Sequence, residues 1–323
     1  YTTSQNPHVA RLIICAFVLS IPEHKLRVIS PDVGGGFGSK IFVYNDECGV
    51  LWAAKQIGRP VKWTADRTEA FFTDCHGRDH VTDAKIALDK EGNIIGLRTK
   101  TYASMGAYLS TLSSCIPTWV HGTLMQGLYT SPAVHVDVTA VVTHTVPVDA
   151  VRGAGRPEAT YGIERLVETA AREIGMDPAE FRLKNFIPPF DGVKQPGYQT
   201  QVALQYDSGN YEGALKKVLK NANYEQLKKE RAAARSDGKL MGIGFSTYIE
   251  ACGIAPSAVV GSLGCRVGLY DAGSIRVHPT GKVTIYSGAH SHGQGHDTTF
   301  SQIVADSFGI GMEDVHVLHG DTE

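Results

Sequence analysis

The sequence predicts an α+β fold, because its strand-like and helix-like stretches are segregated along the chain instead of alternating singly. Residues 61–146 contain several runs typical of strands, and an amphipathic helix is predicted directly after them at 156–175. A second β region, at 240–288, again precedes a predicted helix. We therefore expect mixed sheets with packed helices and not a wound parallel sheet.

The N-terminal part predicts two helices on either side of a glycine-rich loop. Asn6 and Pro7 are the residue types of an N-cap and a first helical position, so a helix is expected from there to about Ser20. The stretch "KLRVIS", residues 25–30, predicts a buried strand that leads into the loop. The stretch "DECGVLWAAKQIG" predicts a helix closed by Gly58.

The middle of the chain predicts three strands and one long helix. The runs "VTDAKIALD", "NIIGLRTKTYASMGAY" and "VHVDVTAVVTHTV" have strand character, and Glu91 and Gly92 mark a turn after the first. Apolar residues then recur at helical spacing in "RPEATYGIERLVETAAREIG": Ile163, Leu166, Val167, Ala170, Ala171 and Ile174.

A stretch rich in Pro, Gly and Gln, "FIPPFDGVKQPGYQTQ", is the best candidate for a domain boundary. We expect a first cofactor-binding domain at 1–200 and an incomplete second one at 201–323. A lysine-rich helical stretch near 211–235 is expected to be a solvated helix face. A last helix is predicted to start near "GQGHDTTFSQIVADSFG".

The composition is that of an ordinary globular protein with no polyanion partner. The chain has 323 residues, 42% hydrophobic and 20% charged, with a net charge of -2. Nucleic acid is therefore not an expected partner, and no apolar run is long enough to span a bilayer, so a cytoplasmic location is expected. Six cysteines lie without a C-x-x-C pair, at 15, 48, 75, 115, 252 and 265, which favours buried, reduced thiols.

The loop "SPDVGGGFGSK", residues 30–40, does not have the spacing of a known phosphate-binding motif. Lys40 follows Ser39 and precedes Ile41, so it lacks the glycine spacing and hydroxyl of a Walker loop, and the glycines do not form G-x-G-x-x-G. Two interpretations stay open from these residues alone. The glycines either permit a strained turn or leave backbone exposed for a ligand.

Two further glycine-rich stretches favour an anionic ligand. In "SHGQGHDTTF" a helix begins after two glycines, and the free amides of a helix start attract an anion such as phosphate. The alternatives are capping by Asp297 or Thr298, and zinc binding by the three histidines at 290, 292 and 296. In "VRGAGRPEA", Arg152 and Arg156 could bind an oxyanion or carbonyl oxygen, or could pair with nearby glutamates at 158 or 164.

Four stretches, "TTSQNPH", "DVGGGFGSK", "DAVRGAGRPEA" and "SHGQGHDTTF", together resemble the molybdenum-binding large subunit of the molybdenum hydroxylases. This family includes xanthine dehydrogenase, aldehyde oxidoreductase and carbon monoxide dehydrogenase. The resemblance runs over the whole chain and is strongest to the carbon monoxide dehydrogenase-like branch. It implies a molybdopterin-dependent oxidoreductase that hydroxylates an aldehyde or an aromatic N-heterocycle, with water as the oxygen source.

The resemblance also implies roles for individual residues. Gln5 and Arg152 take the catalytic positions beside the molybdenum, which is held by the pterin and not by protein side chains. The resemblance also implies a set of cofactor-contacting residues, which are Arg152, Gly35, Gly36, Phe37, Gly38, Gln294, Gly295, His296, Thr298 and Thr299. Phe245 and Ser246 match positions that line the family's substrate pocket.

Departures from the family pattern narrow the expected substrate. Ile41 stands where purine hydroxylases have a glutamate, and Val120 where they have an arginine, so a purine would lose both polar partners. Gly153 stands where carbon monoxide dehydrogenases have a copper-binding cysteine, and without a thiolate copper has no soft ligand. Carbon monoxide oxidation is therefore not expected.

The resemblance finally implies the rest of the assembly. Molybdopterin, as the cytosine dinucleotide, is expected in this chain, with [2Fe-2S] on a small subunit and FAD on a medium subunit, in a dimer of heterotrimers. The family's general-base glutamate lies beyond Glu323, and Glu250 is not expected to replace it. We expect the chain to be the first part of the cofactor region, and a catalytically silent cofactor-binding piece or an unrelated nucleotide-binding module are the alternatives.

Overall fold

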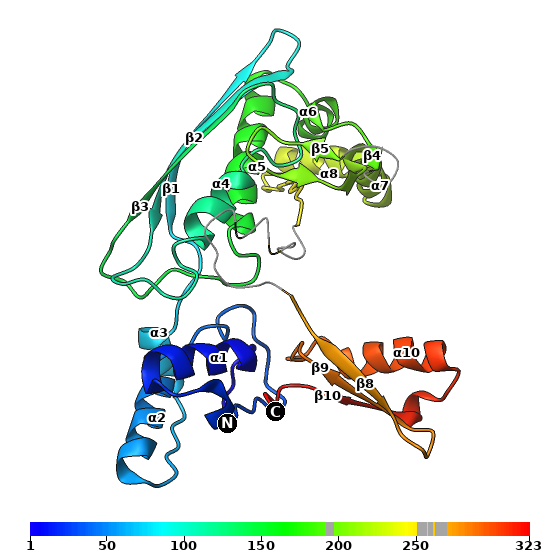
Figure 1. Cartoon of the computed structure of the whole chain (residues 1–323). Helices are drawn as coiled ribbons and strands as arrows, with labels where there is room; N and C mark the ends of the chain where they lie inside the picture. Colours follow the sequence, from blue (N-terminus) through cyan, green and yellow to red (C-terminus); the bar gives the residue numbers. More distant parts are fainter. Residues whose placement is uncertain (192–196, 251–256, 258–260, 262–269) are drawn as a thin grey trace. The chain divides into compact units, whose positions relative to one another are not determined.

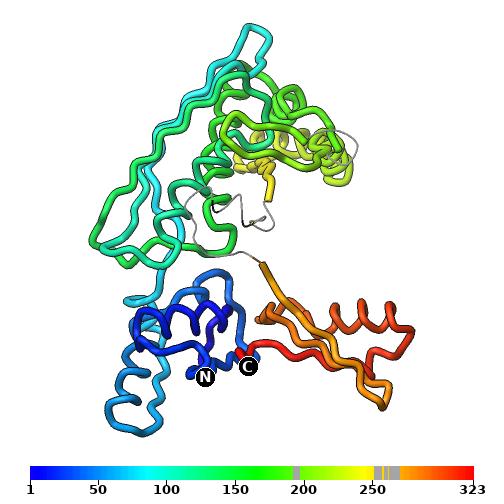
Figure 2. Tube along the Cα trace, in the orientation of Figure 1, coloured from blue at the N-terminus to red at the C-terminus, as the bar shows by residue number. Residues whose placement is uncertain are grey.

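The computed structural model describes residues 1–191, 197–250, 257, 261 and 270–323. The chain divides into two compact units, one made of Tyr1–His76 with Ala251–Glu323 and the other of Gly77–Glu250. Each unit contains helices and a mixed three-stranded sheet (Figures 1 and 2), so the predicted α+β class is confirmed. No helix in the described part of the chain is long and apolar enough to cross a membrane.

The first unit begins with the helices that the sequence predicts. Helix α1, Pro7–Ile13, is capped by Asn6, whose Oδ1 accepts from Val9 N at 3.2 Å, and it continues as a π-helical segment, Ile14–Leu19. A 3-10 turn follows at Glu23–Lys25, and α2, Asn45–Ile57, ends at Gly58 with φ 63°. The short helix α3, Arg67–Thr73, closes this part.

The prediction of a strand at residues 25–30 is wrong. Only an isolated bridge forms there, between Ile29 and Asp321. Val28 N donates to Thr322 Oγ1 at 2.9 Å and Ser30 N donates to Gly320 O at 2.7 Å, so this segment pairs with the far end of the chain over a few residues. Among the described residues, no partner strand of greater length lies beside this segment. A ladder of backbone hydrogen bonds therefore cannot extend along it.

The sheet of the first unit has the strand order β10-β9-β8. Strand β8, Gly273–Val277, is antiparallel to β9, Val283–Ser287, and β10, Val315–Leu318, is parallel to β9. Helix α10, His296–Phe308, packs on the sheet through Val304 against Val283 and Ile285, and a 3-10 turn at Met312–Asp314 leads into β10. The predicted last helix is thus confirmed. Of the predicted β region 240–288, residues 240–250 are not strand, and most of 251–269 lies outside the described residues.

The second unit is built on a longer sheet. Strand β1, His80–Leu88, pairs antiparallel with β2, Ile94–Ser104, and β2 pairs parallel with β3, Val134–Val141. Helix α5, Arg156–Glu173, buries Ile163 and Val167 in a core that includes Ile94 and Leu97 of β2. The three strands predicted within 61–146 are confirmed as β1, β2 and β3. The same range also contains helical segments that the sequence did not predict: α3, a π-helical segment at Ile116–Val120 and a helical turn, α4 at His121–Thr123.

The rest of the second unit is helical with two short antiparallel strand pairs. Helix α6, Pro178–Asn185, follows α5, and strand pairs form between β4, Phe190–Asp191, and β7, Ser208–Gly209, and between β5, Tyr198–Gln199, and β6, Gln205–Tyr206. The lysine-rich stretch forms two helices, α7 at Tyr211–Asn221 and α8 at Tyr224–Ser236, separated by Asn223 with φ 49°.

The cysteines of the described part behave as expected. Cys15 and Cys75 are buried and Cys48 and Cys115 are half-buried, and none of these four described cysteines forms a disulfide. The other two, at 252 and 265, lie outside the described residues.

Candidate functional site

The glycine loop of the first unit is folded around the side chain of Gln5. Gly38 N donates to Gln5 Oε1 at 2.8 Å, and Gln5 N donates to Lys40 O at 2.9 Å. The hydrogen bond to Oε1 fixes which end of the amide is the oxygen, so Nε2, which can only donate, points the other way. Nε2 has no hydrogen-bond partner among the described residues. The amide is therefore oriented by the backbone and can donate to a ligand.

The close approach of Gln5 explains one glycine of the loop. A Cβ added to Gly36 would lie 2.6 Å from Gln5 Oε1, which is closer than two such atoms can pack. Phe37 has the left-handed φ of 56°, and its side chain is 57% exposed. A Cβ at Gly34, in contrast, would meet nothing within 4 Å, so protein packing does not require a glycine there. The bare backbone at Gly34 leaves room for a bound group.

The second glycine-rich loop, residues 288–296, connects β9 to α10 in the same unit. Its N-cap residue Gly295 has φ 77°, and no side chain caps the start of α10. The capping predicted as an alternative is therefore not formed: Asp297 Oδ2 instead lies 3.6 Å from His319 Nε2. Thr298 and Thr299 are exposed on the first turn. A helix start of this kind favours an anion.

Gln294 is held within this loop by His292. Gln294 Oε1 accepts from His292 N at 2.7 Å, and Gln294 Nε2 lies 3.0 Å from His292 Nε2. His296 stacks on Phe300 with ring centroids 5.0 Å apart. The loop is thus ordered by its own side chains.

Buried imidazole nitrogens without partners accumulate on this loop. The Nδ1 atoms of His290, His292 and His296 are all buried, and none has a hydrogen-bond partner in the described structure. Burial lowers the pKa of His290 and of His292, which favours the neutral form of both rings. His290 Nε2 lies 3.4 Å from Pro31 O and must donate to it, so its Nδ1 is an acceptor, whereas His292 Nε2 accepts from the Gln294 amide, so its Nδ1 is a donor. Buried polar atoms are rarely left unpaired, and a ligand that both donates and accepts hydrogen bonds would satisfy them. The zinc alternative has no support, because the described residues contain no cluster of metal-ligating side chains.

The second unit contains the loop around Arg152. Arg78 donates through Nη1 to Val151 O at 3.0 Å and through Nη2 to Arg152 O, so one guanidinium holds two successive carbonyl groups. The Arg152 side chain is exposed, while Arg156 Nε lies 3.2 Å from Glu250 Oε1. Arg156 therefore pairs with Glu250, a glutamate that the sequence did not suggest as its partner.

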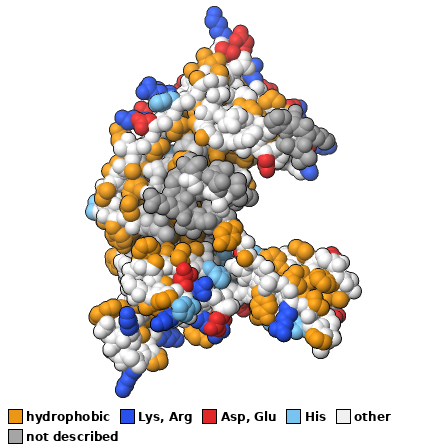
Figure 3. Space-filling view, viewed as in Figure 1, with side chains coloured by type: hydrophobic (Ala, Val, Ile, Leu, Met, Phe, Trp, Pro, Cys, Tyr) orange, Lys and Arg blue, Asp and Glu red, His pale blue; other side chains and the backbone are white. Residues whose placement is uncertain are grey.

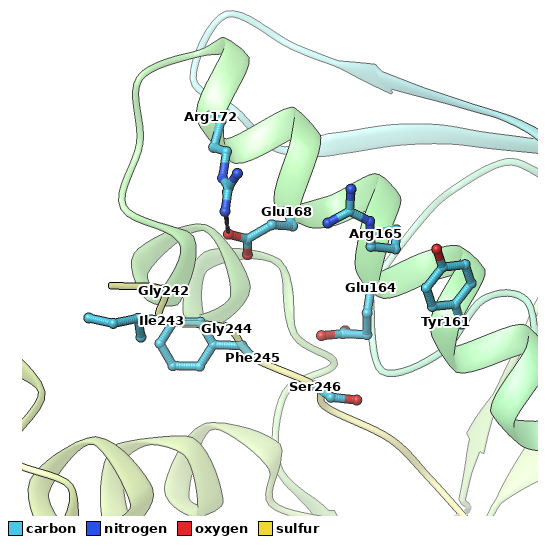
Figure 4. A pocket seen from close by; sticks show the side chains of 10 residues that line it. All are labelled: Tyr161, Glu164, Arg165, Glu168, Arg172, Gly242, Ile243, Gly244, Phe245 and Ser246. Atoms are coloured by element: carbon cyan, nitrogen blue, oxygen red, sulfur yellow. Dashed lines mark hydrogen bonds and ion pairs between the residues drawn. The ribbon is translucent and has the colours of Figure 1, made fainter. Parts of the chain in front are cut away.

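Phe245 and Ser246 line a pocket of about 410 Å³ in the second unit (Figure 4). Its other walls come from α5 and from residues 242–244, and two of its side chains are the buried Glu164 and Glu168. Both carboxylates bind the fully buried Arg182, at 3.0 and 3.1 Å. The Phe245 ring centroid lies 5.3 Å from the Arg182 guanidinium carbon, so Phe245 also packs against this ion network.

The sequence-selected residues fall into two groups. The first unit holds Gln5, the loop Gly35–Gly38, Ile41 and the segment Gln294–Thr299; the second holds Val120, Arg152, Phe245 and Ser246. Val120 is buried and packs beside the loop after Arg152, because a Cβ at Gly155 would lie 2.9 Å from its Cγ1. The sequence did not point to His319. Only the tertiary structure shows its contacts with the 288–296 loop, and no sequence motif marks them.

Charged side chains do not gather by sign on the surface that one view of the described residues shows. Figure 3 shows acidic, basic and histidine side chains interspersed over the visible face of the described residues. This agrees with the net charge of -2 and gives no footprint for a polyanion.

An oriented amide, bare backbone at a glycine loop and an uncapped helix start are features suited to binding an anionic, hydrogen-bonding cofactor. Residues 1–186 match the family model of a molybdopterin cofactor-binding domain, and residues 217–323 match a second such model. The chain belongs to the molybdopterin cofactor-binding family.

Individual relatives agree with this assignment. The chain is 41% identical to the carbon monoxide dehydrogenase large chain of Hydrogenophaga pseudoflava, with 100% of this chain and 40% of the relative covered. It superposes on quinoline 2-oxidoreductase from Pseudomonas putida 86 with a TM-score of 0.92 and 32% identity, covering 100% of this chain and 40% of that one. For a carbon monoxide dehydrogenase from Oligotropha carboxidovorans the TM-score is 0.89 and the identity 36%, with 99% and 40% covered. The chain thus spans about 40% of the length of the curated relatives it matches.

Proposed function

We propose that this chain is the cofactor-binding part of a molybdenum hydroxylase large subunit, which hydroxylates an aldehyde or an aromatic N-heterocycle with oxygen from water. The observation that carries the proposal is the Gln5 amide, fixed by Gly38 N at 2.8 Å in the unit that also holds the uncapped start of α10. When bound, the molybdenum cofactor would supply the two-electron oxidation of the substrate carbon.

The residues present fit such a cofactor. Gln5 Nε2 donates, and the backbone of the glycine loop offers amides at a surface left bare at Gly34. The unpartnered Nδ1 atoms of His290, an acceptor, and of His292, a donor, are suited to a pterin, which both donates and accepts hydrogen bonds. The start of α10, with its two exposed threonines, is suited to the phosphates. Arg152 is the cation proposed to polarise a substrate oxygen or an oxyanion.

The substrate pocket is proposed to be apolar at two positions where a purine needs polar partners. Ile41 and Val120 cannot donate or accept hydrogen bonds, so neither offers a purine a polar side-chain contact. Phe245 and Ser246 are the proposed pocket residues of the second unit. The similarity to a quinoline oxidoreductase supports an aromatic heterocycle as one substrate class.

Carbon monoxide is not the proposed substrate, despite the similarity to its dehydrogenases. Gly153 occupies the position expected for a copper-binding cysteine, and it has φ 103°. A Cβ there would lie 2.6 Å from Cγ of Pro157, so a cysteine side chain has no room without a shift of the loop. Copper would consequently lack a thiolate ligand at this place.

The proposal includes the rest of the assembly. The pterin is proposed to be the cytosine dinucleotide form, and electrons would leave through [2Fe-2S] on a small subunit and FAD on a medium subunit. The whole would be a dimer of heterotrimers in the cytoplasm. The general-base glutamate is proposed to lie in the part of the large subunit that this chain does not contain.

The test is purification of the chain with the rest of its polypeptide and its partner subunits from a host supplied with molybdate. We expect about one molybdenum and one pterin per large subunit, and reduction of an electron-accepting dye by aldehydes or N-heterocycles. Cofactor without dye reduction over the whole panel would favour the silent cofactor-binding alternative. Absence of both molybdenum and pterin would refute the proposal.

A further inference from the structure

His290 is a buried imidazole between the two cofactor loops of the first unit. It lies on the 288–296 loop, is 5% exposed, and places Nε2 3.4 Å from Pro31 O at the start of the glycine loop. We propose that His290 is a positioning residue that fastens the glycine loop, and through it the Gln5 amide, to the loop that begins α10. The effect of His290 on cofactor retention rests on the proposed function, but its effect on the position of the glycine loop does not.

The surroundings of His290 fix its tautomer. A carbonyl oxygen can only accept, so Nε2 must carry the hydrogen that is directed at Pro31 O. Burial lowers the pKa of the ring, and this outweighs the opposite effects of the backbone groups of Pro31, Ser30 and Gln5. The ring is consequently neutral, with a donor toward the glycine loop and an unprotonated Nδ1 that has no partner in the described structure.

The other face of the ring is fixed by the end of the chain. A Cβ at Gly320 would lie 2.8 Å from His290 Cδ2 and 2.2 Å from Ser30 O, so only a glycine allows this approach. The His319 ring lies edge-on to His290 with centroids 5.3 Å apart, and its Nδ1 accepts from Ser291 N at 3.5 Å. The imidazole therefore cannot move away from the glycine loop without displacing this segment.

A short chain of hydrogen bonds connects this place to Gln5. Ser30 Oγ donates to Ser4 O at 2.6 Å, and Ser4 Oγ donates to Lys40 O at 3.1 Å. Lys40 O also accepts from Gln5 N, and Gln5 Oε1 accepts from Gly38 N. Ser4 and Ser30 are almost fully buried, so these bonds are shielded from water. The position of the 288–296 loop thus influences the orientation of the Gln5 side-chain amide.

The experiment compares His290→Phe with His290→Gln in the complete complex. Phenylalanine keeps the ring but removes the donor, whereas glutamine places an N–H group near the position of Nε2. Hydrogen exchange followed by mass spectrometry reads the amides of residues 30–41, and molybdenum content is measured before and after prolonged dialysis. The control is His316→Phe, because His316 lies exposed on β10 of the same unit.

In His290→Phe the amides of residues 30–41 should exchange about tenfold faster than in the wild type, because the loss of one ordinary hydrogen bond changes an equilibrium constant by about that factor. The exchange rates of the α10 amides should not change. His290→Phe should also lose molybdenum faster, while His290→Gln and His316→Phe stay within about twofold of the wild type in both measurements, a margin well under the effect of one hydrogen bond. Unchanged exchange in folded His290→Phe, or equal acceleration in the Phe and Gln variants, would overturn the proposal. If the Phe variant does not fold, His290→Asn, whose amide is too short to reach Pro31, takes its place with the same expectations.

The two proposals fail in different ways. Wild-type complex without molybdenum or pterin would refute the proposed function, and the exchange of residues 30–41 would still decide the role of His290. Wild-type complex with cofactor but no effect of His290→Phe would refute only the positioning role.

Discussion

Acid should destabilise the second unit through one buried histidine, His121. Its side chain is 1% exposed, its ring centroid lies 4.4 Å from that of His80, and Nε2 lies 3.3 Å from Thr101 Oγ1. Burial, and next the neighbouring His80, lower the pKa of His121 to about 3. In the unfolded chain the same ring titrates near 6.5, so between these two values the unfolded state binds a proton that the folded state does not.

The sign and size of the effect follow from this difference. The contribution of His121 to stability is fully present above pH 6.5 and is lost as the pH falls toward 3. At pH 5 the loss is about 1.5 pH units multiplied by 1.36 kcal/mol, or ~2 kcal/mol relative to pH 8. This figure is the same for any folded pKa below about 4, because the folded ring is then neutral at pH 5.

The perturbation is His121→Gln, which can keep a hydrogen bond to Thr101 and does not titrate. Urea unfolding at pH 8 and pH 5, read by pulsed hydrogen exchange of peptides from β1–β3, gives the pH-dependent change for each protein. The wild type should lose ~2 kcal/mol more than the variant between the two pH values. Groups common to both proteins largely cancel, and the constant cost of the substitution is removed by the comparison. An equal pH dependence in both would refute the assignment of a neutral, buried His121.

Three further predictions concern the loops and the ion network. Gly36→Ala places a methyl group against the Gln5 amide, 2.6 Å from its Oε1, and should lower molybdenum content or turnover at least about tenfold, whereas Gly49→Ala, with open space around it, should not. Arg152→Ala should abolish dye reduction in the complete complex while circular dichroism stays unchanged, and wild-type rates would remove Arg152 from the site. Arg182→Met should cost about 3–5 kcal/mol in urea unfolding, because Glu164 would be buried without a cation and Glu168 would keep only the mostly exposed Arg172. A loss under ~1 kcal/mol would show that solvent reaches them.

Local signals determined much of the secondary structure and the family. The N-cap at Asn6, the glycine that ends α2 and the apolar spacing of α5 each act within a few residues, so the sequence alone identified these helices. The glycine-rich motifs were also recognisable in sequence, because close backbone approach to a ligand requires glycine itself and not a pattern of hydrophobicity.

Long-range pairing was decided only by the tertiary structure. Residues 25–30 have the composition of a strand, but their partner is a segment 294 positions away that offers a few hydrogen bonds and no ladder. The same long-range approach buries His290 against the glycine loop, and a fold in which both ends of the chain share one unit is invisible to local periodicity. The sequence by itself identified the glycine-rich loops as candidate ligand-binding loops, since that depends on residue type. The tertiary structure decided which of them lie together, since that depends on contacts between residues distant in sequence.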